Sequence, residues 1–400
     1  MHTKKFINKR APAAPKPKNN MAKPLKIALL FDDTLDKPDG VQQYILTVGA
    51  WLASQGHHVH YIVGETTRTD IPNTHSLARN VKVRFNQNRM SIPLPVSRRK
   101  IRALLAREQF DVIHVQVPYS PQLAARVIAA APAKTAIVGT FHIAPHSAMV
   151  HVANRALGMW LKSTLRRIDK MMAVSSVAHD FAKRTFHIDS QVVPNTIDLQ
   201  PFFAGEPFPQ FADKPTIVFL GRLVERKGCQ HLLEAVAQLV QADVAPFRVV
   251  VCGGGPLEAT LKSYVTAHHL ESVVKFTGFI SEADKPRYLA SADVVTYPST
   301  GGESFGIVIL EAMAAAKGAV LAGDNPGYAS VLAEHPEALF APKDIPAFAA
   351  LLKKYIENDR LRRQARTWQQ TYVRQYNAPV VGARILAVYK AALHERQNVR

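Results

Sequence analysis

The chain has 400 residues, of which 47% are hydrophobic, a length and composition that predict about two globular domains. Its two cysteines, Cys229 and Cys252, are too few for a disulfide framework and lack metal-ligand spacing, which favours a reducing compartment. No run approaches the roughly 20 apolar residues of a membrane span, and Asp32 and Asp33 end the first apolar patch. We therefore expect a protein that is neither secreted through a signal peptide nor membrane-spanning.

The net charge of +19 is concentrated in the N-terminal half. Residues 1–26 contain eight Lys or Arg and no acid, residues 27–205 contain 20 basic and 12 acidic residues, and residues 206–400 contain 22 and 19. The imbalance predicts an anionic partner, either nucleic acid or a membrane of acidic lipids, although charge can also serve solubility alone. Residues 1–24, rich in Lys, Pro and Ala, are predicted to form a disordered tail. The tail is nearly devoid of aromatic residues, which argues against nucleic-acid binding.

From Lys26 onward, short β-branched runs alternate with helical patterns, which predicts parallel sheets with crossover helices. The pattern pauses in a proline-rich segment and then restarts. We predict an α/β protein with two doubly wound, Rossmann-like domains at 25–200 and 216–376, a hinge at 201–215 and a C-terminal helix at 377–400 that crosses back to the first domain. The strands are expected at 27–31, 59–63, 111–115, 136–140, 170–174, 216–220, 247–251, 273–276 and 293–297.

Two loops of the first domain carry candidate binding groups, because ligands of doubly wound sheets sit beyond the carboxyl ends of the strands. A polar turn after the first strand opens a helix at Gly40, where backbone N–H groups suit a phosphate. His142 follows the strand at 136–140 and is placed to hydrogen-bond a substrate, although a lone histidine is more often structural.

A basic amphipathic helix is predicted at 97–110, with Ile101, Leu104 and Leu105 on its apolar side. This profile suits a helix lying on an anionic bilayer, although an ordinary docked surface helix has the same pattern and is commoner. The cations proposed to face the membrane are Arg98, Arg99, Lys100 and Arg102.

Two loops of the second domain combine glycine with cations. The loop GRLVERKG at 221–228 contains Arg222 and Lys227, and two cations on such a loop suit a diphosphate leaving group, whose charge grows as its bond breaks. Two solvated surface cations would match equally well. The turn CGGGPL at 252–257 lacks the full dinucleotide-binding spacing and is interpreted as packing geometry.

Glu303 and Glu311 lie eight residues apart in the run PSTGGESFGIVILEAM. On one helix they would fall within about 80° of each other and could face the same cavity. A capped helix with Glu311 on a solvated face matches the same spacing. The apolar neighbours of Glu311 predict a specific partner for its carboxylate.

Four motifs in this order, GTFH at 139–142, VPNTID at 193–198, GRLVERKG at 221–228 and GGESFGIVILE at 301–311, resemble the retaining glycosyltransferases of family 4. The resemblance runs from about Lys26 to the C-terminus and is strongest to the bacterial phosphatidylinositol mannosyltransferases. It implies a GT-B fold, in which two Rossmann-like domains close over a nucleotide sugar.

The resemblance also implies a role for each loop. Arg222 and Lys227 would bind the donor diphosphate, which makes a metal unnecessary, and the sequence has no Asp-x-Asp site. Glu303 would hold the sugar hydroxyls and Glu311 the ribose. His142 would contact the sugar near its anomeric carbon; the catalytic set is His142, Arg222, Lys227 and Glu303. Further donor-binding residues are Gly40, Gly221, Gly278, Phe279, Ile280, Ser304, Phe305 and Gly306, and the acceptor-binding residues are Asp36 and Gln42.

Two positions depart from the family pattern. Asp39 precedes Gly40 where the family usually carries a second glycine, and Asp33 takes the place of a tyrosine near the inositol. We expect a cytoplasmic, peripheral membrane enzyme that moves a hexose, such as mannose from GDP-mannose, to a lipid headgroup such as phosphatidylinositol. The alternatives are a UDP- or GDP-sugar transferase of glycan assembly, a nucleic-acid-binding protein and an inactive partner subunit; the intact motifs argue against the last.

Overall fold

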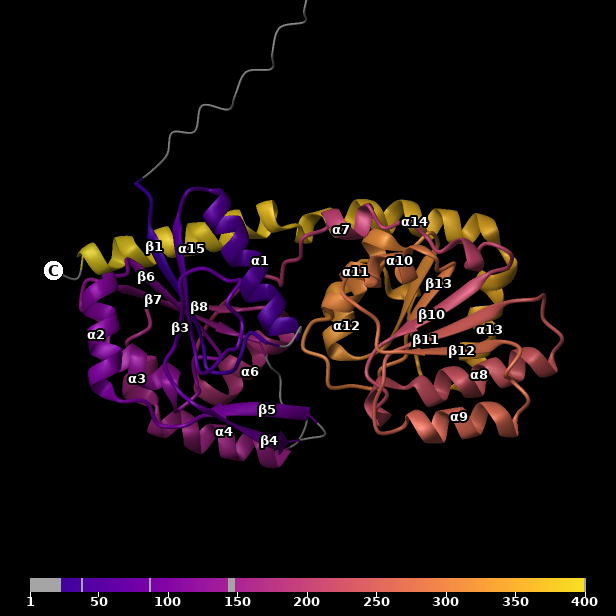
Figure 1. Cartoon of the computed structure of the whole chain (residues 1–400), viewed down its shortest axis with the longest axis horizontal. Helices are drawn as coiled ribbons and strands as arrows, with labels where there is room; N and C mark the ends of the chain where they lie inside the picture. Colours follow the sequence, from indigo (N-terminus) through magenta and orange to yellow (C-terminus); the bar gives the residue numbers. More distant parts are fainter. Residues whose placement is uncertain (1–22, 37–38, 86–87, 143–147, 399–400) are drawn as a thin grey trace, which may run out of the picture.

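The computed structural model describes residues 23–36, 39–85, 88–142 and 148–398. These residues form two lobes that lie side by side (Figure 1), each built on a parallel sheet covered by helices on both faces. The predicted α/β class with two doubly wound units is confirmed. Of the predicted tail, residues 1–22 lie outside the described residues.

The N-terminal sheet has seven parallel strands in the order β3-β2-β1-β6-β7-β8-β9. Side chains of β1 alternate between its two faces: Ile27 and Leu29 pack towards α1 and α15, whereas Ala28 and Leu30 pack towards α2 and α3. Burial on both faces explains why these strands read as continuous apolar runs. The strands are β1 (Lys26–Phe31), β2 (His58–Val63), β3 (Thr74–Ser76), β6 (Val112–Gln116), β7 (Ala136–Phe141), β8 (Lys170–Ala173) and β9 (Gln191–Val192). The helices are α1 (Gly40–Ser54), α2 (Arg98–Glu108), α3 (Leu123–Ala130), α4 (Ala148–Trp160), α5 (Lys162–Leu165) and α6 (Ser176–Phe186).

The C-terminal sheet has six strands in the order β12-β11-β10-β13-β14-β15. Ile217 and Phe219 of β10 pack on one side of this sheet, and Val218 packs on the other. The strands are β10 (Thr216–Leu220), β11 (Arg248–Cys252), β12 (Val274–Gly278), β13 (Val294–Tyr297), β14 (Ala319–Gly323) and β15 (Leu339–Phe340). The helices are α8 (Cys229–Gln241), α9 (Glu258–Ala267), α10 (Lys285–Ala290), α11 (Ile307–Ala315), α12 (Pro326–Val331), α13 (Ile345–Glu357) and α14 (Asp359–Tyr372).

All nine predicted strands are present, within one or two residues at their ends. The prediction missed β3, β9, β14 and β15, and it missed an antiparallel hairpin of β4 (Asn80–Phe85) and β5 (Asn88–Pro93), which forms a small sheet of its own.

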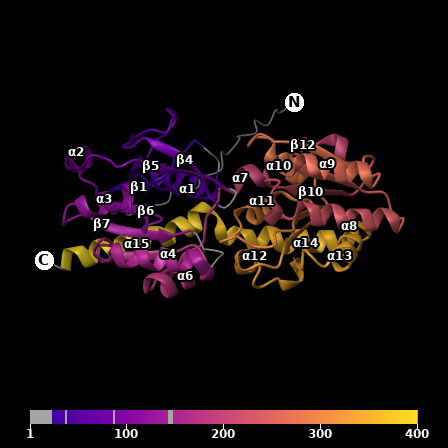
Figure 2. The same cartoon turned by 90° about the horizontal axis from the view of Figure 1, so that it is seen from below.

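Two crossings connect the lobes, and they lie next to each other. Ile197 forms a β-bridge with Asn377, and Thr196 Oγ1 donates to the carbonyl oxygen of Tyr376 at 2.9 Å. The segment 201–215 contains α7 (Gln200–Phe203) and a short 3-10 turn at Pro209–Phe211, and it packs on the C-terminal lobe. After the second crossing, α15 (Ala378–Asn398) packs along the N-terminal sheet, as Figures 1 and 2 show.

Each sheet reverses its strand order at one point, between β1 and β6 in the first lobe and between β10 and β13 in the second. The loops that leave neighbouring strands at such a point diverge and open a crevice. The loops after β1, β10 and β13 carry most of the predicted site residues, so these residues lie at the switch points of the two sheets.

Candidate active site

The loops after β10 and β13 are tied together at the switch point of the C-terminal sheet. The backbone carbonyl of Arg226 accepts hydrogen bonds from the backbone N–H of Thr300 at 2.9 Å and from Ser299 Oγ at 3.0 Å. These bonds hold the glycine loop 221–228 against the loop 298–306, so residues about 75 apart in sequence meet.

Glu303 lies at this junction with two cations on one carboxylate oxygen. Its Oε1 is 2.7 Å from Arg226 Nη1 and 2.9 Å from Lys227 Nζ, and it accepts a hydrogen bond from Ser299 at 3.0 Å. Burial alone would raise the pKa of Glu303, but Lys227 and Arg226 outweigh it and hold the pKa below its usual value. Sequence reasoning selected Lys227 but missed Arg226; its position beside Lys227 in the quoted motif was the only signal. Arg222 is half-buried in the same loop.

The helical-wheel relation between Glu303 and Glu311 is wrong, because α11 begins only at Ile307. Glu303 therefore belongs to the loop, and only Glu311 belongs to the helix. Glu311 is 3% exposed, which also excludes the solvated-face interpretation.

The predicted partner of Glu311 is present: Lys285 of α10 lies 2.9 Å from Oε1. The same ammonium lies 2.8 Å from Glu282. Burial raises the pKa of Glu311 despite Lys285, and the second oxygen, Oε2, is buried without a hydrogen-bond partner among the described residues. A buried carboxylate oxygen without a donor is costly, so this atom is suited to accept a ligand hydroxyl.

The N-terminus of α11 lies next to the N-terminus of α1 from the other lobe. A Cβ placed on Gly40 would lie 3.4 Å from Ile307 Cδ1, so the first residues of the two helices are in near contact. Gly306 has φ +123° just before α11, a conformation that favours glycine, and a Cβ there would lie 2.8 Å from Tyr328. Two helix N-termini this close together place their unpaired backbone N–H groups near each other, an arrangement that suits an anion.

The two lobes also meet directly beside these helix ends. Ser175, which caps α6 of the first lobe, donates through Oγ to the carbonyl oxygen of Ser304 at 2.6 Å. Phe305 is buried and packs edge-on against Tyr376. The loop that carries Glu303 is thus supported from both lobes.

An exposed aromatic ring lies near the loops that follow β11 and β12. Phe279 is 85% exposed and follows Gly278, whose φ is +69°. A Cβ on Gly254 would lie 2.7 Å from the ring of Phe279, so the ring lies over the glycine turn 252–257. A Cβ on Gly253 or Gly255 would collide with the backbone of Gly221 or Leu223, so these glycines allow the turn to pack closely against the loop after β10. Ile280 is half-buried beside it.

His142 follows β7 and is almost completely buried in the first lobe. Its Nε2 lies 2.6 Å from Gln116 Oε1 at the end of β6, and its ring packs edge-on against Tyr44 of α1 at 4.9 Å. Burial lowers the pKa of His142 to about 3, so its imidazole is neutral near pH 7. The neutral ring can hydrogen-bond a ligand. It does not carry the extra proton that a charged imidazolium could give up as an acid.

The two predicted acceptor residues occupy different environments. Asp36 is exposed, and its Oδ1 accepts hydrogen bonds from Thr66 Oγ1 at 2.5 Å and Thr67 N at 2.9 Å. Gln42 is 3% exposed and donates to the carbonyl oxygen of Thr34 at 3.1 Å. The structure therefore leaves Asp36 accessible to an acceptor, whereas Gln42 supports the loop from beneath.

The predicted basic helix is α2, and it has the expected two sides. Ile101, Leu104 and Leu105 are buried against the first lobe. The cations Arg98, Arg99, Lys100 and Arg102 are exposed. In the described part of the chain, no helix combines the length and apolarity required to cross a bilayer.

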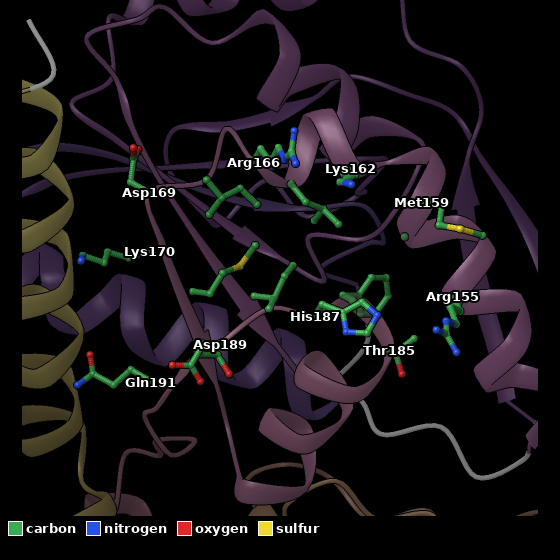
Figure 3. Close-up of a pocket in the computed structure, with 17 residues that line it drawn as sticks. Arg155, Met159, Lys162, Arg166, Asp169, Lys170, Thr185, His187, Asp189 and Gln191 are labelled. Carbon is green, nitrogen blue, oxygen red and sulfur yellow. The ribbon is translucent and has the colours of Figure 1, made fainter.

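A cavity of about 950 Å³ opens on the first lobe, between the end of α4, α5 and the segment after α6 (Figure 3). Lys170 and Met171 line it from the beginning of β8, so it lies beside the amino ends of the strands. The loops that carry Lys227 and Glu303 instead follow the carboxyl ends of β10 and β13. None of the predicted site residues lines this cavity, and it is separate from the candidate active site.

Comparisons with known proteins match both halves of the chain to glycosyltransferases. The profile of Glycosyltransferase Family 4 matches residues 38–201, and that of Glycosyl transferases group 1 matches residues 206–370. Two similar proteins are named phosphatidyl-myo-inositol mannosyltransferase, one from Mycobacterium tuberculosis and one from Propionibacterium freudenreichii, and each is 30% identical to this chain. Each alignment covers 92% of this chain, and it covers 97% of the first relative and 95% of the second. HepE of Anabaena, solved with UDP-glucose, superposes with a TM-score of 0.67 at 19% identity, covering 92% of this chain and 100% of HepE, which establishes the GT-B fold.

Proposed function

The chain belongs to the glycosyltransferases that join a family 4 domain to a group 1 domain, and we propose that it is a retaining mannosyltransferase acting on a membrane lipid. The donor would be GDP-mannose and the acceptor a lipid headgroup such as phosphatidylinositol. The relatives named phosphatidyl-myo-inositol mannosyltransferase, which cover nearly the whole chain, support this choice of sugar and acceptor.

The observation that carries the donor site is the buried Glu311 carboxylate with one unpartnered oxygen. A ribose offers hydroxyl donors to such an atom. Around it, the neighbouring N-termini of α1 and α11 suit the diphosphate, and the exposed ring of Phe279 suits a nucleobase face. In this arrangement Glu311 would hold the ribose, the helix ends would hold the phosphates, and Phe279 would stack on the base.

Glu303 and Lys227 supply the chemistry of transfer in this proposal. Sugar hydroxyls bind the Glu303 carboxylate, and Lys227 with Arg222 stabilises the diphosphate as the bond from the anomeric carbon to the phosphate oxygen breaks. The acceptor hydroxyl attacks from the same face, and its proton passes to the departing phosphate. The neutral imidazole of His142 positions the sugar beside this centre.

Membrane association would follow from α2. Its exposed cations lie on a helix whose apolar side is already packed into the first lobe, so we propose electrostatic docking on anionic lipids at the cytoplasmic face. Asp36, exposed near the switch point of the first sheet, would bind the headgroup.

A donor and acceptor screen tests the proposal. Thermal melting with GDP- and UDP-hexoses should show the largest stabilisation by GDP-mannose. Mannose transfer should then occur to vesicles containing phosphatidylinositol, with the product keeping the anomeric configuration of the donor by NMR. Stabilisation by a UDP-hexose with transfer to a soluble or polyprenyl-linked glycan would instead establish the alternative, a transferase of glycan assembly.

A further inference from the structure

Three metal-ligating side chains gather at the outer edge of the first lobe. His60 of β2, His75 of β3 and Glu108 at the end of α2 each offer one ligand atom, and these atoms all lie within 4.8 Å of one another. His60 Nδ1 is 3.0 Å from His75 Nε2, whereas the other ring nitrogen of His60, Nε2, is 4.0 Å from Glu108 Oε2, so an ion shared with His75 would be bound through Nδ1. No predicted role in sugar transfer uses any of the three.

The two imidazoles already present ring nitrogens to each other. His60 Nδ1 and His75 Nε2 share one hydrogen bond, so one of them carries the proton that a bound metal ion would displace. Two nitrogen ligands on a tetrahedral zinc ion lie about 3.3 Å apart, because each bond is about 2.0–2.1 Å. The observed separation of 3.0 Å requires only a small adjustment.

We propose that His60, His75 and Glu108 form a binding site for a divalent transition metal, with zinc as the best fit. Two neutral imidazoles and one carboxylate are a ligand set that zinc accepts, with water in the fourth position. Because the ligands come from β2, β3 and α2, the metal joins the edge of the sheet to the end of the basic helix.

The site is separate from the candidate active site. His60 and Lys26 lie towards the amino ends of β2 and β1, whereas the loops of the candidate active site follow the carboxyl ends of their strands. Figure 1 shows α2 on the side of the first lobe that faces away from the second lobe. Loss of metal binding at this edge would therefore leave the proposed transferase activity unchanged.

Lys26 competes with the metal for Glu108. Its ammonium lies 2.6 Å from Glu108 Oε2, and Arg107 lies 2.7 Å from Oε1. Metal binding must displace Lys26, which is partly exposed and can move into solvent. This competition predicts that Lys26→Gln binds zinc more tightly than the natural chain, whereas a purely structural ion pair predicts no such gain.

Zinc titration of the untagged, chelator-treated full chain by calorimetry tests the site. One equivalent should bind, with a rise in Tm, and His75→Ala or Glu108→Gln should weaken binding by more than the roughly 10–100-fold typical of outer-shell losses. His58→Ala, an exposed histidine on the same strand, is the matched control and should bind normally. X-ray absorption should show nitrogen and oxygen ligands only. Absence of binding, binding unaltered in both ligand variants, or sulfur ligation from the two cysteines would overturn the proposal.

Discussion

Lys285 and Glu311 form an ion pair of 2.9 Å between α10 and α11, and it engages only one of the two carboxylate oxygens. Glu282 holds the same ammonium from the solvent side at 2.8 Å. Lys285 therefore fixes the rotamer of Glu311 and leaves Oε2 directed at no protein donor among the described residues. Such preorganisation lowers the cost of binding a hydroxyl ligand.

Glu311→Gln should raise the KM for the nucleotide sugar by roughly 10–100-fold, because a hydrogen bond to a charged group contributes about 1.5–3 kcal/mol. The kcat should change less, since the ribose lies away from the reacting bond. Steady-state kinetics at saturating acceptor measure both. Glu282→Gln removes an exposed carboxylate from the same lysine and should leave the KM near its natural value; an equal rise in both variants would contradict ribose binding by Glu311.

Lys227→Ala and Arg222→Ala should each lower kcat by about 10²–10³-fold, the effect typical of removing one electrostatic donor to developing charge. Arg226→Ala removes the other cation on Glu303 and provides the comparison. Both cations contact Glu303, but only Lys227 is also proposed to bind the diphosphate, so the loss of Arg226 should lower kcat less than the loss of Lys227. Single-turnover rates with bound donor are the measurement, and natural rates in Lys227→Ala would refute its assignment to the diphosphate.

The fold was predictable because buried parallel strands have a strong local signal. The run TIVFL at β10 is β-branched and bounded by proline and glycine, and the structure has the strand at the same residues. The run AVLAG at β14 was missed because alanine and glycine have low strand propensity. Its hydrogen-bonded pairing with β13 stabilises the strand in spite of that low propensity. The hairpin β4–β5 was missed because its strands, NVKVRF and NRMSIP, alternate polar with apolar residues and so lack the continuous apolar run of the buried parallel strands.

The candidate site was only partly predictable, because its contacts join distant segments. The apolar neighbours of Glu311 indicated a partner. Lys285 lies 26 residues before Glu311 in the sequence, and nothing near it in the sequence distinguished it from the other lysines. The helical wheel failed because Gly306, at φ +123°, delays the start of α11 until Ile307. Positive φ at glycine is permitted but not required, so the sequence alone does not locate this boundary.

His142→Ala should lower kcat by about 10²-fold while affinity for the nucleoside diphosphate changes little, because the imidazole is assigned to the sugar rather than the phosphates. Calorimetry with GDP and initial-rate kinetics separate the two effects. His142 contacts Gln116 and Tyr44 in the interior, so the variant should also be compared by denaturant unfolding. An equal loss of binding and turnover would identify a structural histidine.

Replacing Arg98, Arg99 and Arg102 of α2 by Gln should weaken binding to acidic vesicles by roughly 100-fold at low salt, at about 1 kcal/mol per cation near the surface. Co-sedimentation with vesicles of increasing anionic lipid content measures this. The matched control replaces three exposed arginines of α14, Arg360, Arg363 and Arg366, and removes the same charge from the other lobe. Equal weakening in both variants would mean that net charge, rather than α2, governs adsorption.

Asp32→Asn tests a buried carboxyl at the end of β1. Asp32 is 8% exposed and accepts hydrogen bonds from Ser120 Oγ and from the backbone N–H of Ala124, yet burial outweighs them and raises its pKa from 3.8 to about 6. Between these values the folded state keeps a proton that the unfolded state has lost, so this group's contribution to stability falls as pH rises.

From pH 4.5 to pH 7.5, the free energy of unfolding of the natural chain should therefore fall by about 2 kcal/mol relative to Asp32→Asn, whose amide does not titrate. Urea unfolding of both proteins across this range gives the difference directly. Glu303 provides the opposite sign, because its pKa is held below the usual value by Lys227 and Arg226 and its contribution is lost only as pH falls. A constant difference between natural chain and Asp32→Asn would mean that Asp32 is ionised in the folded state throughout, with hydrogen bonds from Ser120 and Ala124 strong enough to offset its burial.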